Sequence, residues 1–215
     1  RWLCYSALLC ESNPPARAVA GYRHSVFIDG EGRLSSCGYV PDHPLLSPSL
    51  LGHGEGVAQL NTPTRLPSSL GGERAVSVSA GAGHSLALAA DGSVWSWGCG
   101  ASRRLGHGDQ QNQWQPKKIE AFAGRRIVAV SAAAVHSLAL TADGAVWSWG
   151  FGIRGRLGHG DQQSQSLPKK VEALAHQHVV AVAAGFSHTL AFTADGSVWS
   201  WGFGGRGARA PGGPR

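Results

Sequence analysis

The stretch His178–Gly202 reads HVVAVAAGFSHTLAFTADGSVWSWG and contains three short runs with the side-chain chemistry of β-strands. Successive side chains of a strand point to opposite faces, so His188, Leu190 and Phe192 are expected to share one face. Asp195-Gly196, between the second and third runs, predicts a hairpin, because glycine accepts the positive backbone angles of a tight turn. The predicted strands are 179–183, 188–193 and 198–201.

This stretch is one copy of an internal repeat. Residues 104–150 and 156–202 are identical at about two thirds of their positions when they are aligned at an offset of 52 residues. A more divergent first copy has an offset of 60 to the second copy, because it carries a proline-rich insertion near residues 39–50. Pro168 indicates a fourth strand at a sheet edge, since proline cannot donate to a ladder. Four short strands per copy are typical of a β-propeller blade, so the predicted fold class is all-β.

The repeats divide the 215 residues into three predicted parts. Residues 1–16 are expected to be a truncated N-terminal segment, and residues 203–215 a disordered tail rich in Gly, Arg and Pro. Because the sequence has no methionine, we expect a piece of a longer chain, whose targeting signals cannot be judged from it. The propeller repeats span 17–202, with copies near 17–54, 73–108, 125–160 and 177–202 and outer strands that connect them.

The motif L-G-H-G follows the third predicted strand in the first three copies. A histidine followed by an aspartate, as in His107-Gly108-Asp109, has the residue types of a general base with its orienting carboxylate, or of a metal ligand. A catalytic group has no reason to recur once per blade, whereas a turn does, so we interpret these histidines as turn residues that hydrogen-bond to the backbone. The structural interpretation covers His53, His107 and His159, and also His84, His136 and His188 at the start of the second strands.

No metal site or cofactor is predicted. Copies of L-G-H-G more than fifty residues apart lie on different blades, and no H-x-x-H or C-x-x-C pair accompanies them. The recurring W-S-W places two indoles on one face of each third strand, where large rings would fill the space between blades. Trp97, Trp149 and Trp201 are therefore predicted to be core residues.

The fixed order V-x-x-V-x-A-G, x-x-H-[ST]-L-A-L, D-G-x-V-W-S-W-G and R-L-G-H-G-D resembles the repeat of the regulator of chromosome condensation family over residues 17–202. The resemblance implies seven-bladed propellers, so about four copies would form an open arc or a fragment of such a ring. The sequence pattern "GRLGHGD…PKK…EAL" especially resembles the propellers of giant HECT ubiquitin ligases. A plant ultraviolet-B photoreceptor of this family carries its sensing tryptophans in G-W-R-H-[ST] motifs. The matching positions here are Tyr22, Ala82, Ala134 and Phe186, which disfavours light sensing.

A formal net charge of +6 favours anionic partners. Two lysine pairs occupy equivalent positions on neighbouring copies and are expected to gather on one rim; an ordinary solvated surface is the alternative. The expected partner is an acidic protein surface, such as a small GTPase, a ubiquitin-pathway protein or a chromatin protein, and direct nucleic-acid binding stays open. No membrane partner is expected, and the expected location is intracellular, cytoplasmic or nuclear. The candidate partner-binding residues are Lys117, Lys118, Lys169, Lys170, Arg125 and Arg126.

Two functions follow from this sequence. The first is a non-enzymatic protein–protein interaction propeller, a module of a larger ubiquitin ligase or regulatory protein. The alternative, implied by the resemblance, is a guanine-nucleotide exchange factor for a small Ran-like GTPase or a chromatin-binding propeller, with the 39–50 loop as the candidate wedge. An enzyme is not predicted from this chain, because no nucleophile–base pair or carboxylate pair stands outside the repeat pattern.

Overall fold

The computed structural model describes residues 17–39, 48–67 and 70–203, and the regular elements in these ranges are β-strands and single 3-10 turns. The strands form four antiparallel sheets, which we call blades 1 to 4. Blade 1 contains β1 (Arg17–Ala20), β2 (His24–Ile28), β3 (Leu34–Tyr39) and β4 (Gln59–Arg65); blade 2 contains β5 (Ala75–Ala80), β6 (His84–Ala89), β7 (Val94–Gly98) and β8 (Gln113–Lys118); blade 3 contains β9 (Ile127–Ala132), β10 (His136–Thr141), β11 (Val146–Gly150) and β12 (Gln165–Lys170); blade 4 contains β13 (Val179–Ala184), β14 (His188–Thr193) and β15 (Val198–Gly202). The short turns are η1 (Pro48–Leu51), η2 (Ala101–Arg103), η3 (Glu120–Phe122), η4 (Ile153–Gly155) and η5 (Glu172–Leu174).

Each blade is a meander in which consecutive strands pair. The predicted Asp-Gly hairpins are present: Gly144 has a φ of 84° between β10 and β11, and Gly92 and Gly196 have nearly the same value. Pro168 lies in β12, which pairs only with β11, as expected of an edge strand. The all-β propeller-blade fold predicted from the repeat is therefore confirmed.

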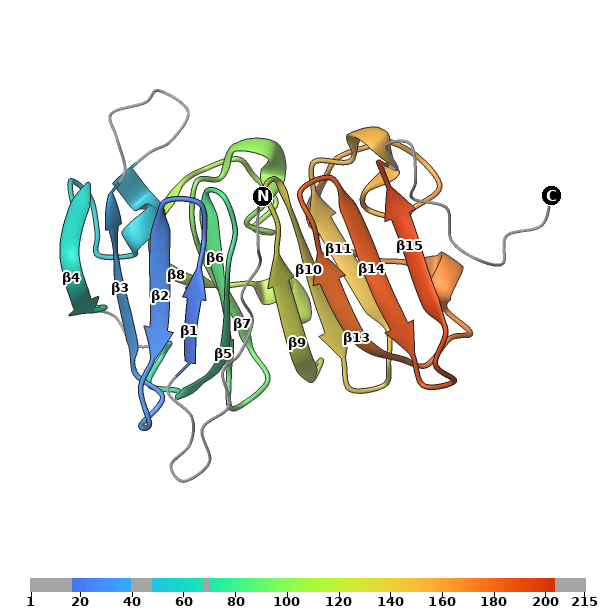
Figure 1. Cartoon of the computed structure of the whole chain (residues 1–215), viewed down its shortest axis with the longest axis horizontal. Helices are drawn as coiled ribbons and strands as arrows, with labels where there is room; N and C mark the ends of the chain where they lie inside the picture. Colours follow the sequence, from blue (N-terminus) through green and yellow to red (C-terminus); the bar gives the residue numbers. More distant parts are fainter. Residues whose placement is uncertain (1–16, 40–47, 68–69, 204–215) are drawn as a thin grey trace.

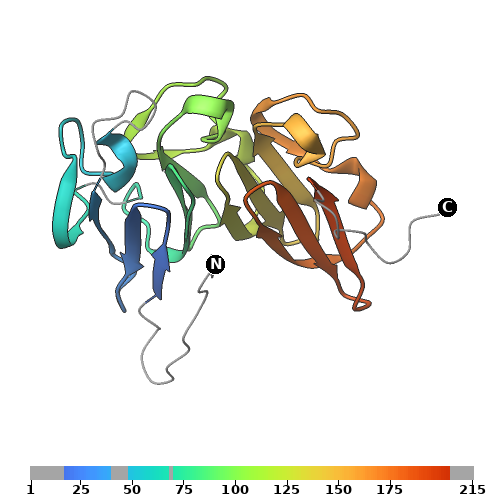
Figure 2. The same cartoon turned by 45° about the horizontal axis from the view of Figure 1, so that its top comes forward.

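The four blades lie side by side in chain order and form an open arc (Figure 1). Blades 1 and 4 are at opposite ends of the molecule and do not meet (Figure 2). One detail differs from the prediction of four strands in every copy: within the described residues blade 4 has three strands. The predicted N-terminal segment 1–16, the predicted tail 203–215 apart from Phe203, and most of the 39–50 loop lie outside the described ranges.

The hydrophobic core of the described residues consists of three layers between neighbouring blades and a smaller fourth cluster of Leu50, Leu51 and Cys99. Each blade turns aliphatic side chains of its second and third strands towards the next blade, where they meet the tryptophans and small residues of that blade. Between blades 2 and 3, for example, Leu86, Leu88 and Val94 pack with Ala139 and Trp149. Stability of such an array comes mainly from contacts between nearest neighbours.

Candidate functional site

The L-G-H-G turn is held by a serine of the preceding strand. In blade 2, Ser96 Oγ donates to the carbonyl of Leu105 at 2.8 Å and lies 2.9 Å from His107 Nε2. Because the serine proton is already used, the histidine is the donor of the second bond. The sequence predicted a direct hydrogen bond from the histidine to the backbone. In the structure the histidine bonds to the serine hydroxyl, and that hydroxyl bonds to the backbone. The same arrangement joins Ser36 to His53 at 3.1 Å and Ser148 to His159 at 3.0 Å.

The L-G-H-G turn also reaches the next blade. The amide of Gly108 donates to the carbonyl of Ser166 in β12 at 2.9 Å, and the amide of Gly54 donates to the carbonyl of Trp114 in β8 at 3.0 Å. Gly106 approaches the ring of Trp149 in blade 3 so closely that a Cβ atom there would lie 2.9 Å from Nε1. The turn is therefore part of the contact between blades.

In blades 1 to 3, the histidine that begins the second strand forms a further contact between blades. His84 Nε2 lies 2.8 Å from Ser137 Oγ of blade 3, and that hydroxyl donates to the carbonyl of Arg104 at 2.8 Å. His84 is therefore the donor to Ser137. The same contact pairs His24 with Ser85 at 2.7 Å and His136 with Thr189 at 3.1 Å. His188, in blade 4, is exposed.

Burial keeps these histidines neutral. His136 is fully buried, and this burial, with a smaller contribution from the charge of Arg156, lowers its pKa to about 3. Burial lowers the pKa of His24 to about 4 and that of His84 well below its usual value. For His107, burial followed by the nearby charge of Lys117 lowers the pKa to about 4.

The closing tryptophans lie in the layers between blades. Trp97 and Trp149 are fully buried, whereas Trp201 is half-buried. Trp149 Nε1 donates to the carbonyl of Arg104 in blade 2 at 2.9 Å. That carbonyl accepts from Ser137 as well, so two side chains of blade 3 converge on one backbone atom of blade 2.

The two lysine pairs occupy equivalent places on the outer strands of blades 2 and 3. We call Lys117, Lys118, Lys169 and Lys170 the basic rim. Within the described ranges none of them forms an ion pair, and the first lysine of each pair is exposed while the second is half-buried. Hydrogen bonds, and to a smaller extent the charges of Lys118 and Lys170, lower the pKa of Asp91 and Asp143 respectively. These two carboxylates, in the hairpin turns, therefore offset part of the positive charge of Lys118 and Lys170.

Arg125 and Arg126 lie between η3 and β9 and are exposed. The Arg125 guanidinium stacks 4.7 Å from the centroid of Trp147, which is the cross-strand partner of Lys170. Its Nη1 atom donates to the carbonyl of Ala121 at 3.0 Å. Arg125 therefore lies near the outer edge of blade 3, close to one end of the basic rim.

A surface hollow of about 540 Å³ adjoins the lysines of blade 2. It lies between the L-G-H-G turn of blade 1 and the outer strand β8. Trp95 and Trp114 supply apolar surface, and Glu55 supplies one negative charge. The lining residues are Gly54, Glu55, Trp95, Gln113, Trp114, Gln115, Pro116, Lys117 and Lys118.

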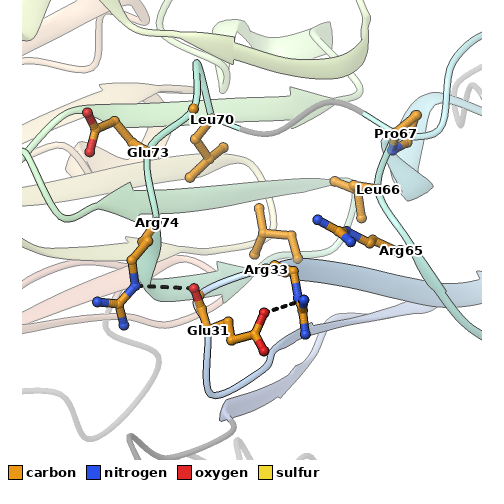
Figure 3. A pocket seen from close by; sticks show the side chains of 11 residues that line it. Glu31, Arg33, Arg65, Leu66, Pro67, Leu70, Glu73 and Arg74 are labelled. Carbon is orange, nitrogen blue, oxygen red and sulfur yellow. Dashed lines mark hydrogen bonds and ion pairs between the residues drawn. The ribbon is translucent and has the colours of Figure 1, made fainter.

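A second hollow, of about 580 Å³, lies where blade 1 connects to blade 2. Figure 3 shows Arg65 and Arg74 on opposite sides of it, with the paired Arg33 and Glu31 between them. Arg33 Nε also contacts Asp29 at 2.6 Å, and Arg74 Nε donates to the carbonyl of Glu31 at 3.2 Å. Arg33 and Arg74 are thus both bonded to residues of the turn between β2 and β3.

Within the ranges given above, the structure contains no group of three or more His, Cys, Asp or Glu side chains that could hold a metal ion. The same ranges contain no helix with the length and hydropathy needed to cross a bilayer.

Comparison with known proteins agrees with the repeat pattern and the fold. Residues 91–140 and 143–192 match the family description "Regulator of chromosome condensation (RCC1) repeat", and a second family description of the same repeat matches residues 75–103, 127–156 and 179–208. The chain belongs to this repeat family. The resemblance inferred from the motifs is confirmed.

Two curated relatives and one solved structure illustrate the similarity. The human E3 ubiquitin-protein ligase HERC2 is 38% identical over 202 residues, which are 93% of this chain and 4% of HERC2. The Ultraviolet-B receptor UVR8 of Arabidopsis thaliana is 38% identical over 195 residues, 89% of this chain and 42% of the receptor. Yeast RCC1 (Prp20), in a crystal structure with Kap60, has a TM-score of 0.71 at 24% identity and covers 92% of this chain and 45% of its own. The chain therefore spans less than half of each of these relatives.

Sequence reasoning missed the hydroxyl partners of the histidines. Ser85, Ser137 and Thr189 directly follow the histidine of their own strand but bond to the histidine of the preceding blade. The repeated [ST] after each of these histidines was the available signal, because a side chain one residue along a strand points to the opposite face and hence to the other neighbour.

Proposed function

We propose that this chain is a non-enzymatic interaction module that binds an acidic protein surface through the basic rim. The observation that carries the proposal is the recurrence of two unpaired lysines at the same place on two adjacent blades. The repeated histidines, in contrast, are occupied in contacts that join turns and blades. A group of like charges that no ion pair neutralises attracts anionic surfaces and fixes the orientation in which they dock.

The hollow beside Lys117 and Lys118 supports a protein partner in particular. Trp95 and Trp114 offer apolar surface next to the ammonium groups, so an acidic segment with a large apolar side chain fits this chemistry. Interfaces of this kind combine a desolvated aromatic anchor with charges around it.

The similarity to HERC2 supports a role for this chain as one module of a larger protein. HERC2 is a ubiquitin-protein ligase by name, and this chain matches only 4% of it, so any ligase chemistry belongs to other parts of such a protein. A partner from the ubiquitin pathway is accordingly part of the proposal. The alternative functions, nucleotide exchange on a small GTPase and chromatin binding, have no further observation in their favour; residues 40–47 of the candidate wedge lie outside the described ranges.

The test is a binding titration with a fluorescein-labelled poly-glutamate peptide. Reversal of all four charges of the basic rim to glutamate should weaken binding at least about tenfold, which corresponds to about 1.4 kcal/mol. Raising the salt from about 0.1 M to about 1 M should abolish binding by the parent chain, because the Debye length falls from about 10 Å to about 3 Å.

The matched control reverses four exposed cations elsewhere, Arg17, Arg23, Arg65 and Arg74, and changes the net charge by the same amount. The control should retain most of the affinity. Equal losses in both variants would show that net charge alone acts. Tighter binding of a single-stranded DNA oligonucleotide than of the peptide, at the same salt, would contradict the assignment of a protein partner.

A further inference from the structure

Part of the Trp95 ring lines the hollow of about 540 Å³ between blades 1 and 2. Trp95 of β7 and Trp147 of β11 occupy equivalent places, because their cross-strand partners are Lys118 and Lys170. The inner side of Trp95 packs against the layer between blades 1 and 2, and its Nε1 atom donates to Ser93 Oγ at 3.0 Å. The ring is therefore held in place with part of its surface in the hollow.

In blade 3, a cation of the chain itself covers the equivalent ring. The Arg125 Cζ atom lies 4.7 Å from the centroid of Trp147. A cation at such a distance is attracted to the face of an indole. Lys170 is the cross-strand partner of this ring, so a neighbouring ammonium group does not prevent the stacking.

The residue that corresponds to Arg125 in the preceding connection is Glu73. The amide of Arg125 donates to the carbonyl of Phe122 at 2.9 Å, and the amide of Glu73 donates to the carbonyl of Leu70 at 3.1 Å. The two residues thus occupy the same position in equivalent turns but carry opposite charges. At Trp95 the chain does not supply the cation that it supplies at Trp147.

The charge of the hollow also favours a cation from outside. Glu55 is exposed and contributes a carboxylate to the lining, beside the indole. No guanidinium group of the described residues stacks on Trp95; the rings that do carry one are Tyr22, Trp147, Phe151 and Phe203.

We propose that this hollow binds an arginine side chain of a partner protein, stacked on Trp95 and with Glu55 as its counter-charge. Arginine fits better than lysine, because the occupant of the equivalent place in blade 3 is a guanidinium, a planar group that stacks on aromatic rings. Such an arginine is additional to the acidic groups that we propose for the basic rim. Trp114 lies four residues from Lys118, about 13 Å along the strand, and is left for an apolar side chain of the partner.

A titration of the 215-residue chain with N-acetyl-arginine N-methylamide at constant ionic strength tests this site. The indole ¹⁵N–¹H resonance of Trp95, assigned with Trp95→Phe, should shift in a saturable way. The citrulline derivative has the same shape without the charge and should bind at least about threefold more weakly. Glu55→Gln should weaken binding of the arginine derivative by about threefold, and Lys118→Glu should strengthen it by about the same factor.

Lys118→Glu separates this site from the proposed function of the basic rim. The substitution should weaken binding of the poly-glutamate peptide while it strengthens binding of the arginine derivative. If the peptide does not bind to the parent chain, the rim proposal fails, and the response of Trp95 to the arginine derivative still decides the present one.

Arg125→Ala is the matched variant in blade 3. It uncovers Trp147, and Asp109 stands there in the place of Glu55 in the L-G-H-G turn. The Trp147 resonance should respond to the arginine derivative in this variant and not in the parent. Four results would each overturn the proposal: no shift of Trp95, equal binding of the arginine and citrulline derivatives, weaker arginine binding by Lys118→Glu, or a silent Trp147 in Arg125→Ala.

Discussion

His136 is buried without a counter-charge, and burial lowers its pKa to about 3. In the unfolded chain the same imidazole titrates near 6.5. Between these values the unfolded state binds a proton that the folded state does not, so the stability contributed is complete above pH 6.5 and is lost as the pH falls. We expect the free energy of unfolding to fall by up to about 1.4 kcal/mol per pH unit for this histidine below pH 6.5.

His136→Gln provides the comparison in urea unfolding at pH 7.5 and pH 5.5. Glutamine keeps a side-chain N–H for Thr189 but does not titrate. The variant should lose less stability than the parent between the two pH values. An identical loss would show that His136 does not contribute to the acid sensitivity.

Truncation of the turn histidines His107 and His159 should lower the free energy of unfolding. Truncation leaves the serine hydroxyl without its donor in a partly buried turn, which costs about 1 to 3 kcal/mol when a buried polar group loses its partner. His107→Ala and His159→Ala should each lower the free energy of unfolding in urea by an amount in this range. Unchanged unfolding of both variants, together with loss of poly-glutamate binding, would place these histidines in a binding site instead.

Within one structural element, the L-G-H-G turn, the two glycines have different structural roles. Both have positive φ, 82° at Gly106 and 91° at Gly108. A Cβ atom at Gly106 would meet the Trp149 indole at 2.9 Å, whereas one at Gly108 would meet only Leu167, at 3.7 Å. The first glycine is needed for the approach to the next blade as well as for its backbone angle.

Gly108→Ala should therefore cost about 1 kcal/mol from the backbone angle alone. Gly106→Ala should cost more, by about 1 to 3 kcal/mol, because the Trp149 ring must shift. Thermal and urea unfolding of the two variants give the difference directly. Equal losses would mean that the contact between this turn and blade 3 contributes nothing to stability.

The strands of blade 4 were predictable from the sequence, because alternation and the Asp-Gly turns are local signals. The predicted runs 179–183 and 198–201 each end one residue before β13 and β15 do. The partner of each buried histidine was not predictable in the same way. His84 bonds to a residue 53 positions later, on another blade, and only the packing of the blades brings the two together.

At the scale of the whole molecule, the arc repeats one interface three times. Each interface combines an apolar layer, the L-G-H-G turn and the contact from a histidine to a hydroxyl of the next blade. The basic rim lies on the outer strands of blades 2 and 3, outside these layers, where we propose that a partner binds.

The central claim is that the repeated histidines join neighbouring blades, and a double-mutant cycle on His84 and Ser137 tests it most directly. Urea unfolding of the parent, His84→Ala, Ser137→Ala and the double variant gives the coupling energy between the two side chains. We predict a favourable coupling of about 0.5 to 1.5 kcal/mol, the usual net contribution of one hydrogen bond. A coupling energy of zero, with the effects of the two single substitutions simply adding, would contradict the claim that this contact holds blade 2 to blade 3.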